Sequence, residues 1–329
     1  MIDSGRSAED VRVAVAQFET RDGDKAYNLS AIERLAAGAA AAGAQLVNFH
    51  ELCVTAYTWL ETLTRAQTAA LAEPVPGGPS TQRLEAIARS RGIWIAAGIV
   101  ERDGERMYNC HAVVSPGGFV AKHRKIHEFI SPHLDCGDRY TTFDAFGWRF
   151  GMLTCYDNNL PENGRMTAML GADAILAPHV TGCLPSPAPG RGVVTPDVWH
   201  GRHRDPVRCR MEFDGPKGRG WIMKWLPARA WENGLYVLYA NVLGEEGGTI
   251  KPGGSMILDP YGEVVTECRS LEDEVVVATL VRANRRLASG ESYIRARRPD
   301  LYAKMVEPNP HLSADKRPEV YWQKIREKK

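Results

Sequence analysis

Short apolar segments recur along the chain and alternate, in its first half, with segments of helical character. Residues 11–18, VRVAVAQF, alternate with a period of two and are rich in β-branched side chains, which predicts a strand. Continuous apolar runs at 45–49 and 94–100 predict buried strands, whereas residues 24–42 and 80–91 predict helices. Later apolar runs come in pairs separated by the turn sequences PGG and DPYG, which predicts hairpins. This pattern favours a mixed sheet packed between helices in a layered α/β fold.

The composition excludes several other classes of protein. At 329 residues, 44% hydrophobic and 25% charged, the chain is long and apolar enough to bury a globular core. Lys and Arg number 41 against 40 Asp and Glu, so a net charge of +1 provides no overall field for nucleic acid or an anionic membrane. The longest weakly polar stretch, residues 34–47, is shorter than the ~20 apolar residues that a membrane-spanning helix needs.

The cysteines and the first residues indicate the compartment. Seven cysteines occur at irregular spacing without a CxxC pair, which argues against a zinc ribbon or a disulfide scaffold. The opening residues, MIDSGRSAED, lack the apolar segment of a signal peptide. We therefore expect a cytoplasmic protein with reduced thiols.

Two stretches differ from the body of the chain. Residues 180–220 are dense in Pro, Gly, Arg and His and predict a long inserted loop, which in a compact domain is usually functional or disordered. Residues 283–329 are basic and interrupted by proline, and predict a tail that packs on the domain or on a partner subunit. The expected organisation is one domain over residues 1–282 followed by this tail.

Three reactive side chains stand where predicted strands end. Glu51 follows the strand at 45–49, at the edge where α/β sheets place ligands, and partial burial there would raise its pKa toward that of a general base. Lys125 follows a strand-like stretch and could stabilise an oxyanion. Cys155 ends an apolar strand just before a predicted helix, a turn that suits a thiol nucleophile. Each has a structural alternative when taken singly: a solvated glutamate, a basic surface run, or an inert buried cysteine.

Together, the three segments resemble the nitrilase (carbon–nitrogen hydrolase) superfamily, in its amidase and carbamoylase branch. The likeness covers roughly residues 11–281 and includes FHEL with Glu51, HRKIH with Lys125 and TCYDNNLPE with Cys155, in the family's order. MYNCHAVVSPGG, GADAILAP, LPARAWENGLYVLYAN and GGSMILDPYGEVV agree as well. The resemblance implies an αββα sandwich, assembled into homodimers or larger homo-oligomers, and a site that needs no cofactor or metal.

The resemblance also implies a role for each residue of the site. Cys155 would attack the carbon of an amide or nitrile, and Glu51 would be the general base for the thiol and later for water. Lys125 and the backbone N–H of Tyr156 would stabilise the tetrahedral intermediate. Ammonia or an amine would leave before water releases the acyl group.

One element of the family pattern is altered here. Many members carry a second glutamate between the lysine and a Pro-Gly-Asp element, but this stretch reads KIHEFISPHLDCGDRY, with Cys136 in place of the proline. Glu128 is the only glutamate in the stretch, three residues after Lys125 and closer than in the usual pattern. The alternatives are that His133 or Asp135 takes the role, or that the role is absent.

The residues after the nucleophile narrow the substrate class. Nitrile-cleaving members usually have Cys-Trp-Glu, whereas this chain has Cys155-Tyr156-Asp157, as amidase and carbamoylase branches more often do. Members that act on N-carbamoyl-D-amino acids have arginines where this chain has Asn158 and Asn159, and an amide lacks the charged fork of a guanidinium. We expect hydrolysis of an amide or N-carbamoyl group in a neutral or differently oriented substrate, with nitrile hydrolysis and acyl transfer as alternatives.

The shape of the substrate pocket depends on loops whose conformation cannot be predicted from the sequence. Tyr57, Tyr156, Asn158, Asn159 and His179 are expected to contact the small-molecule substrate. The 180–220 loop is either a lid that brings His179 and Trp199 near the substrate or a surface or oligomer contact. It also contains basic residues that could bind a substrate carboxylate: Arg191, Arg202, Arg204, Arg208, Arg210, Lys217 and Arg219. Three of its residues could ligate a metal by type but lack convincing spacing: His200, His203 and Cys209.

Overall fold

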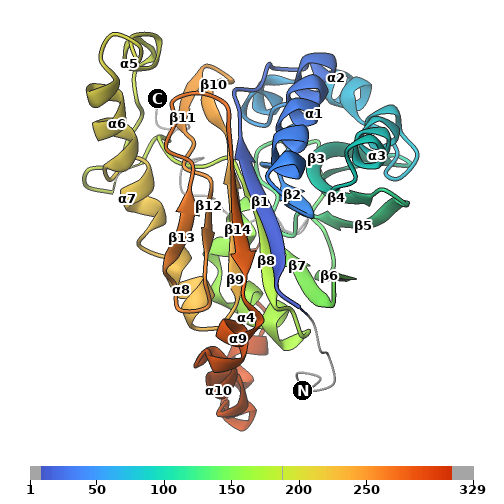
Figure 1. The fold of residues 1–329 in the computed structure, drawn as a ribbon, viewed down its shortest axis with the longest axis vertical. Helices are drawn as coiled ribbons and strands as arrows, with labels where there is room; N and C mark the ends of the chain where they lie inside the picture. The colour runs from blue at the N-terminus through green and yellow to red at the C-terminus, as the bar shows by residue number, and fades with distance from the viewer. Residues whose placement is uncertain (1–8, 187, 313–329) are drawn as a thin grey trace.

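Two six-stranded sheets stack face to face, and helices cover their outer faces (Figure 1). The computed structural model describes residues 9–186 and 188–312. The strands of the first sheet are β1 (Val11–Gln17), β2 (Leu46–Asn48), β3 (Trp94–Asp103), β4 (Arg106–Ser115), β5 (Gly118–Arg124) and β14 (Glu274–Leu280). The strands of the second sheet are β6 (Thr141–Ala145), β7 (Trp148–Met152), β8 (Ala174–His179), β9 (Tyr236–Asn241), β12 (Met256–Leu258) and β13 (Val264–Glu267). A separate hairpin pairs β10 (Leu243–Glu246) with β11 (Thr249–Pro252).

Helices connect these strands and extend the chain beyond them. Those of the first half are α1 (Lys25–Ala41), η1 (Thr58–Thr62), α2 (Arg65–Leu71), α3 (Pro79–Arg91), η2 (Cys155–Asn159) and α4 (Pro161–Met169). Those of the second half are α5 (Pro196–His200), α6 (Pro206–Asp214), α7 (Arg219–Ile222), α8 (Leu226–Trp231), α9 (Arg282–Leu287), α10 (Gly290–Arg295), η3 (Pro299–Leu301) and η4 (Ala303–Val306).

The two sheets have the same internal design. Their strand orders are β14-β1-β2-β3-β4-β5 and β6-β7-β8-β9-β12-β13. In each, one antiparallel pair is followed by two parallel pairs and then two antiparallel pairs. No repeat is visible in the sequence, yet β1 corresponds to β7 and β2 to β8. The loops that follow these central parallel strands carry Glu51 and Cys155.

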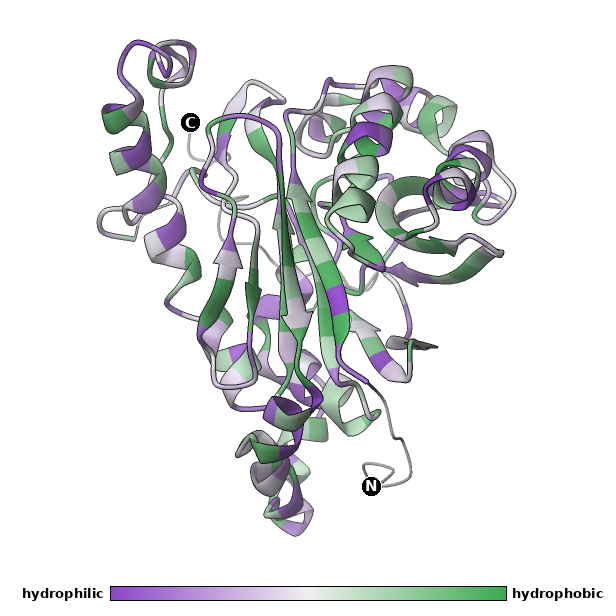
Figure 2. Ribbon diagram, viewed as in Figure 1, coloured by the Kyte–Doolittle hydropathy of each residue, from purple (hydrophilic) through white to green (hydrophobic). Residues whose placement is uncertain are grey.

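The period-two pattern of β1 explains how the layers pack. Val11, Val13 and Val15 lie in the core between the two sheets, whereas Ala14 and Ala16 lie in the core beneath α1 and α3. Branched side chains thus fill the space between the sheets, and small ones let the helices approach closely. In Figure 2 the strands are largely green, and the outer helices alternate between green and purple. The predicted αββα sandwich is confirmed.

The segment that was expected to be a long loop contains three short helices. α5 and α6 pack on the β10–β11 hairpin through an apolar cluster that joins Val198, Cys209 and Phe213 to Leu243 and Ile250. The helices have only four to nine residues and begin near Pro or Gly, so no helical period could emerge from the sequence. The expectation of an irregular loop over 180–220 is therefore corrected to a small helical layer at one end of the sandwich (Figure 1).

The predicted tail begins as two short helices that leave the sandwich at the opposite end, α9 and α10 (Figure 1). Arg285 of α9 is 2% exposed and lies 3.6 Å from Asp173, and Ile294 of α10 packs on the apolar cluster outside the second sheet. This part of the tail packs on its own domain; residues 313–329 lie outside the described residues. Within the described residues, no helix has the length and apolar character needed to cross a membrane.

Candidate active site

Cys155 occupies a strained turn directly after the second sheet's β7. It is the first residue of η2 and has a φ of +50°, a left-handed conformation that is costly for a residue with a side chain. Its Sγ lies 3.9 Å from the carbonyl oxygen of Val180, and its side chain reaches a pocket. Such strain persists only where surrounding contacts hold it, and the same kind of sharp strand-to-helix turn presents nucleophiles in other enzymes.

Asp157 supplies those contacts. Its carboxylate accepts hydrogen bonds from the backbone N–H groups of Thr154, Ile126 and His127, at 3.1, 3.2 and 2.9 Å. The rings of His127 and His123 lie 2.8 and 3.4 Å from its oxygens. Burial alone would raise the pKa of Asp157, but these histidine contacts outweigh it and hold that pKa well below its usual range. One ionised side chain therefore ties the cysteine turn to the segment after β5.

Glu51 and Lys125 meet beneath that turn. Glu51 lies three residues beyond β2, Lys125 directly follows β5, and both side chains are fully buried. Lys125 Nζ donates to Glu51 Oε1 at 2.8 Å and to the Tyr57 hydroxyl at 3.0 Å. Gly98 on β3 permits this placement because a Cβ there would lie 2.0 Å from the backbone nitrogen of Leu52.

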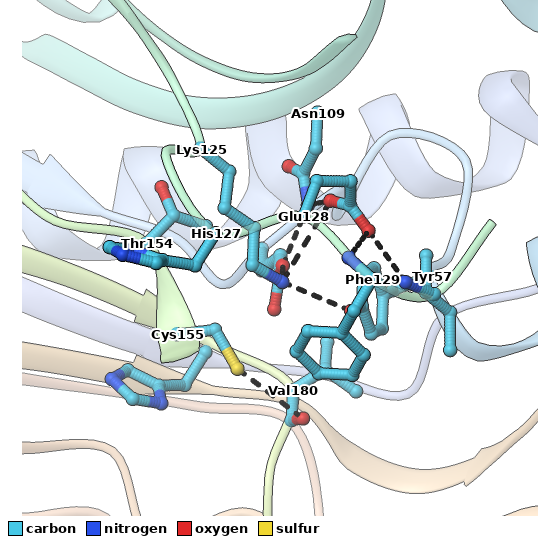
Figure 3. A network of polar contacts seen from close by, with 12 residues as sticks. Tyr57, Asn109, Lys125, His127, Glu128, Phe129, Thr154, Cys155 and Val180 are labelled. Carbon is cyan, nitrogen blue, oxygen red and sulfur yellow. Dashed lines mark hydrogen bonds and ion pairs between the residues drawn. The ribbon is translucent and has the colours of Figure 1, made fainter. Parts of the chain in front are cut away.

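Glu128 completes the cluster through Asn109 (Figure 3). Asn109 Nδ2 donates to Glu51 Oε1 at 2.7 Å and to Glu128 Oε2 at 3.0 Å. Glu128 Oε2 also lies 3.8 Å from Lys125 Nζ, while its Oε1 accepts 2.8 Å hydrogen bonds from two backbone N–H groups, those of Phe129 and Ile130. Both carboxylates are thus held in fixed orientations. In the part of the chain that the structure describes, Glu51 Oε2 alone of their four oxygens has no hydrogen-bond partner.

The charges within the cluster shift its protonation equilibria. Burial raises the pKa of Glu51 above its ordinary value, and Lys125 opposes that rise. Burial alone would lower the pKa of Lys125, but Glu128 and Glu51 outweigh it and raise that pKa well above normal. Burial, together with the charge of Glu51, raises the pKa of the Cys155 thiol. At neutral pH the lysine is therefore charged and the thiol keeps its proton, so attack by sulfur requires a base.

A pocket of about 310 Å³ opens beside the thiol. Its walls are mainly apolar: Phe129, Ile130, Val180, Leu184, Pro185 and Trp221. Four residues that the sequence predicted line this pocket, namely Tyr57, Cys155, Tyr156 and Asn159. The two cationic side chains in the lining are Arg191, from the 180–220 segment, and Lys251, from β11.

Other predicted residues lie elsewhere. Asn158 and His179 are buried outside the lining, where Asn158 Nδ2 contacts Leu153 O at 2.7 Å and His179 Nε2 at 3.1 Å. Trp199 does not approach the pocket as a lid residue, because its ring stacks with Phe213 and its indole N–H donates to Glu19. The other candidates for the second-glutamate role have different contacts: Asp135 lies 3.6 Å from Arg106, and the backbone N–H of His133 donates to Ser131 Oγ. The two histidines weighed as metal ligands contact different glutamates, His200 with Glu245 and His203 with Glu272.

Comparison with known proteins decides the family. A model of the carbon–nitrogen hydrolase family matches residues 12–288. The chain belongs to this family. It is 32% identical over 299 residues to a nitrilase of Pyrococcus abyssi, covering 89% of this chain and 99% of that one. It is also 32% identical over 301 residues to an (R)-stereoselective amidase of Pseudomonas sp., covering 90% and 95%. A solved amidase of the nitrilase superfamily from Nesterenkonia AN1 superposes with a TM-score of 0.67 at 25% identity, covering 91% and 98%.

Sequence reasoning missed three residues of this carbon–nitrogen hydrolase's site. Asn109 had a usable signal, because the hairpin turn at 116–118 pairs the strands that carry Asn109 and Lys125, but a bulge near Val113 shifts the register. Asp157 was read only as part of the motif, although a carboxylate two residues after the nucleophile can hold the turn. Lys251 had no local signal, because distant segments bury it.

Proposed function

We propose that this carbon–nitrogen hydrolase cleaves an amide or N-carbamoyl C–N bond through an acyl-enzyme on Cys155. The observation that carries the proposal is the arrangement of Glu51 beside the buried Cys155 thiol, close enough for its charge to raise the pKa of that thiol. One oxygen of this carboxylate is held by Lys125 and Asn109, and within the described residues the other has no hydrogen bond. A fixed carboxylate with one available oxygen and a raised pKa suits a general base.

The first half of the reaction forms the acyl-enzyme. Glu51 takes the proton of the Cys155 thiol as the sulfur attacks the amide carbon, giving a tetrahedral intermediate with a negatively charged oxygen. The C–N bond then breaks, Glu51 returns the proton to the leaving nitrogen, and ammonia or an amine departs. Cys155 is left as a thioester.

The second half repeats the proton transfers with water. Glu51 takes a proton from water as its oxygen attacks the thioester carbon. The C–S bond breaks, the carboxylic acid leaves, and the proton on Glu51 restores the thiol. Lys125 and the Tyr156 backbone N–H are assigned to both negatively charged intermediates, and one such donor typically contributes ~2.7–4 kcal/mol.

Glu128 is assigned a positioning role. Its side chain contacts Lys125 and Asn109, and through them it fixes the orientation of Glu51. Both of its oxygens already accept hydrogen bonds, from Asn109 and from two backbone N–H groups, whereas Glu51 keeps one oxygen without a partner among the described residues.

A nitrile is the second candidate substrate. A relative named nitrilase matches this chain at the same 32% identity as one named amidase. The same thiol would attack a nitrile carbon, so the site chemistry alone does not separate the two.

Ammonia release from matched amides, N-carbamoyl compounds and nitriles tests the proposal. The wild type is compared with Cys155→Ala and with Cys209→Ala, which removes a buried cysteine from α6 outside the pocket. We expect amide or N-carbamoyl turnover in the wild type and in Cys209→Ala, and none in Cys155→Ala. Acid-quenched mass spectrometry should detect the acyl group on the wild-type chain. Turnover of nitriles alone would favour the second candidate, and activity retained by Cys155→Ala would refute the mechanism.

A further inference from the structure

Lys251 is a buried cation that the proposed reaction does not use. Its side chain is 0% exposed and lines the same pocket as Cys155. Within residues 9–186 and 188–312, its Nζ has no hydrogen-bond partner. Lysine is almost never fully buried unless it is paired, because removing an ammonium from water costs several kcal/mol. Burial accordingly lowers the pKa of Lys251.

Glu246 is the carboxylate with the strongest electrostatic effect on Lys251, but its oxygens are already hydrogen-bonded to other groups. Glu246, on the neighbouring strand β10, accepts hydrogen bonds at Oε1 from the backbone N–H groups of Tyr57 and Thr58, at 3.0 and 2.6 Å. Its Oε2 accepts from the Thr20 hydroxyl at 3.2 Å. Glu246 is thus committed to holding the loop before η1, and Lys251, which lines the pocket, has no hydrogen-bonded counter-ion among the described residues.

A second cation lines the same pocket. The Arg191 guanidinium stacks over the Trp221 ring at 3.9 Å, and its Nε also lacks a hydrogen-bond partner among the described residues. Among residues 9–186 and 188–312, no Asp or Glu lines this pocket. The pocket therefore combines apolar walls, a nucleophile and two cationic side chains. Such a site is complementary to a molecule with an apolar middle and an anionic end.

We infer that the substrate carries a carboxylate in addition to its scissile amide, and that Lys251 binds this carboxylate with support from Arg191. This inference rests on the proposed function. Because a primary amide loses only ammonia, its carboxylate must belong to the acyl portion that stays in the pocket.

This inference changes the expectation drawn from the motif after the nucleophile. Asn158 and Asn159 led to a neutral or differently oriented substrate, because they replace carboxylate-binding arginines. The structure offers a cationic group from another direction, on β11 rather than on the cysteine turn. Of the two alternatives, a substrate bound in a different orientation is therefore the one that the pocket favours.

The test compares two amides of the same shape, glutaramate and 5-methylhexanamide, in which an isopropyl group replaces the carboxylate. The measured quantity is the ratio of their kcat/KM values for the wild type, Lys251→Met and Lys224→Met. Lys224 is an exposed lysine after α7 and serves as the matched control for loss of a positive charge. We expect the wild type and Lys224→Met to favour glutaramate, and Lys251→Met to lower the ratio by on the order of 100-fold. For the neutral amide, Lys251→Met should raise kcat/KM because the pocket becomes more apolar.

Two results would overturn the inference. The first is a wild-type ratio of kcat/KM values near one. The second is an equal fall in kcat/KM for both amides in Lys251→Met, which would mean that Lys251 stabilises the Cys155 thiolate rather than a substrate carboxylate. If Lys251→Met does not fold, the binding of glutaramate and 5-methylhexanamide to Cys155→Ala is compared by calorimetry, where equal affinity would refute the assignment and tighter binding of glutaramate would support it. Failure of the proposed function looks different, because neither amide would then be hydrolysed through Cys155.

Discussion

Replacing Glu128 by glutamine tests whether the buried cluster acts as a unit. The amide oxygen can still accept the two backbone hydrogen bonds that Oε1 accepts now. The amide NH2 would then face Asn109 Nδ2, a donor at 3.0 Å, and the Lys125 ammonium at 3.8 Å. The variant therefore loses one charge-assisted hydrogen bond and one ion-pair partner. Since a hydrogen bond to a charged group contributes about 1.5–3 kcal/mol, a total loss of about 3–4 kcal/mol is expected.

That loss translates into a measurable change in rate. If it falls on the transition state, kcat/KM for amide hydrolysis decreases by ~10²–10³-fold, at about 1.4 kcal/mol for each tenfold. The pH profile provides a second readout. The charge of Glu128 raises the pKa of Glu51, so its removal lowers that pKa. Because Glu51 must be deprotonated to act as the base, the acid limb of kcat/KM should move to lower pH in Glu128→Gln.

Glu101→Gln is the matched control. Glu101 is a buried carboxylate on β3 that pairs with Lys122 and Arg124, outside the pocket. Its substitution should reduce the free energy of unfolding without moving the acid limb. Ammonia release is measured from pH 4 to 9 at a temperature where urea titrations show all three proteins folded. A Glu128→Gln enzyme with kcat/KM within threefold of the wild type and an unmoved acid limb would contradict the positioning role.

Three further substitutions probe the supports of the site. Gly98→Ala places a Cβ 2.0 Å from the backbone after Glu51 and should abolish activity and lower the melting temperature, whereas Gly38→Ala in α1, with its nearest contact at 3.4 Å, should not. Asp157→Asn should lower the free energy of unfolding by about 3–5 kcal/mol at pH 7. Because the folded pKa of Asp157 lies below its ordinary value of 3.8, this difference from the wild type should shrink as pH falls below that value in urea titrations; a constant difference would argue against an ionised Asp157. Tyr57→Phe removes a hydrogen bond from Lys125 and should lower kcat/KM about 10- to 100-fold in the ammonia assay, and an unchanged value would show that the hydroxyl is dispensable.

The sequence was sufficient to predict the layered fold and the positions at which the strands end. The period-two alternation of residues 11–18 predicted a strand, and β1 lies there, with its Val and Ala side chains packed in two different cores. Glu51, Lys125 and Cys155 each stand within three residues of a strand end, as expected. Their convergence followed from the family resemblance rather than from spacing, because no local rule says that the loops of two different sheets meet.

What escaped prediction depends on contacts between distant segments. The Asn109 bridge requires the register of the β4–β5 hairpin, which a bulge changes by one residue. Lys251 lies in the short polar sequence TIKP, and its burial requires the packing of the hairpin against other parts of the chain. α5 and α7 have five and four residues, too few to display a helical period. Tertiary packing rather than local propensity forms these features.

The two sets of residues around Cys155 occupy separate stretches of the chain. The groups assigned to proton transfer and charge stabilisation, Glu51, Asn109 and Lys125, come from the first sheet and its loops. Much of the pocket wall comes instead from residues 180–186 and 188–191, with Trp221 and Lys251. Mutations can therefore alter which molecules are accepted while the machinery for turnover stays intact. Directed evolution of new acids or amides should accumulate its changes in these wall residues, and a graft of the wall onto a relative should carry selectivity with it.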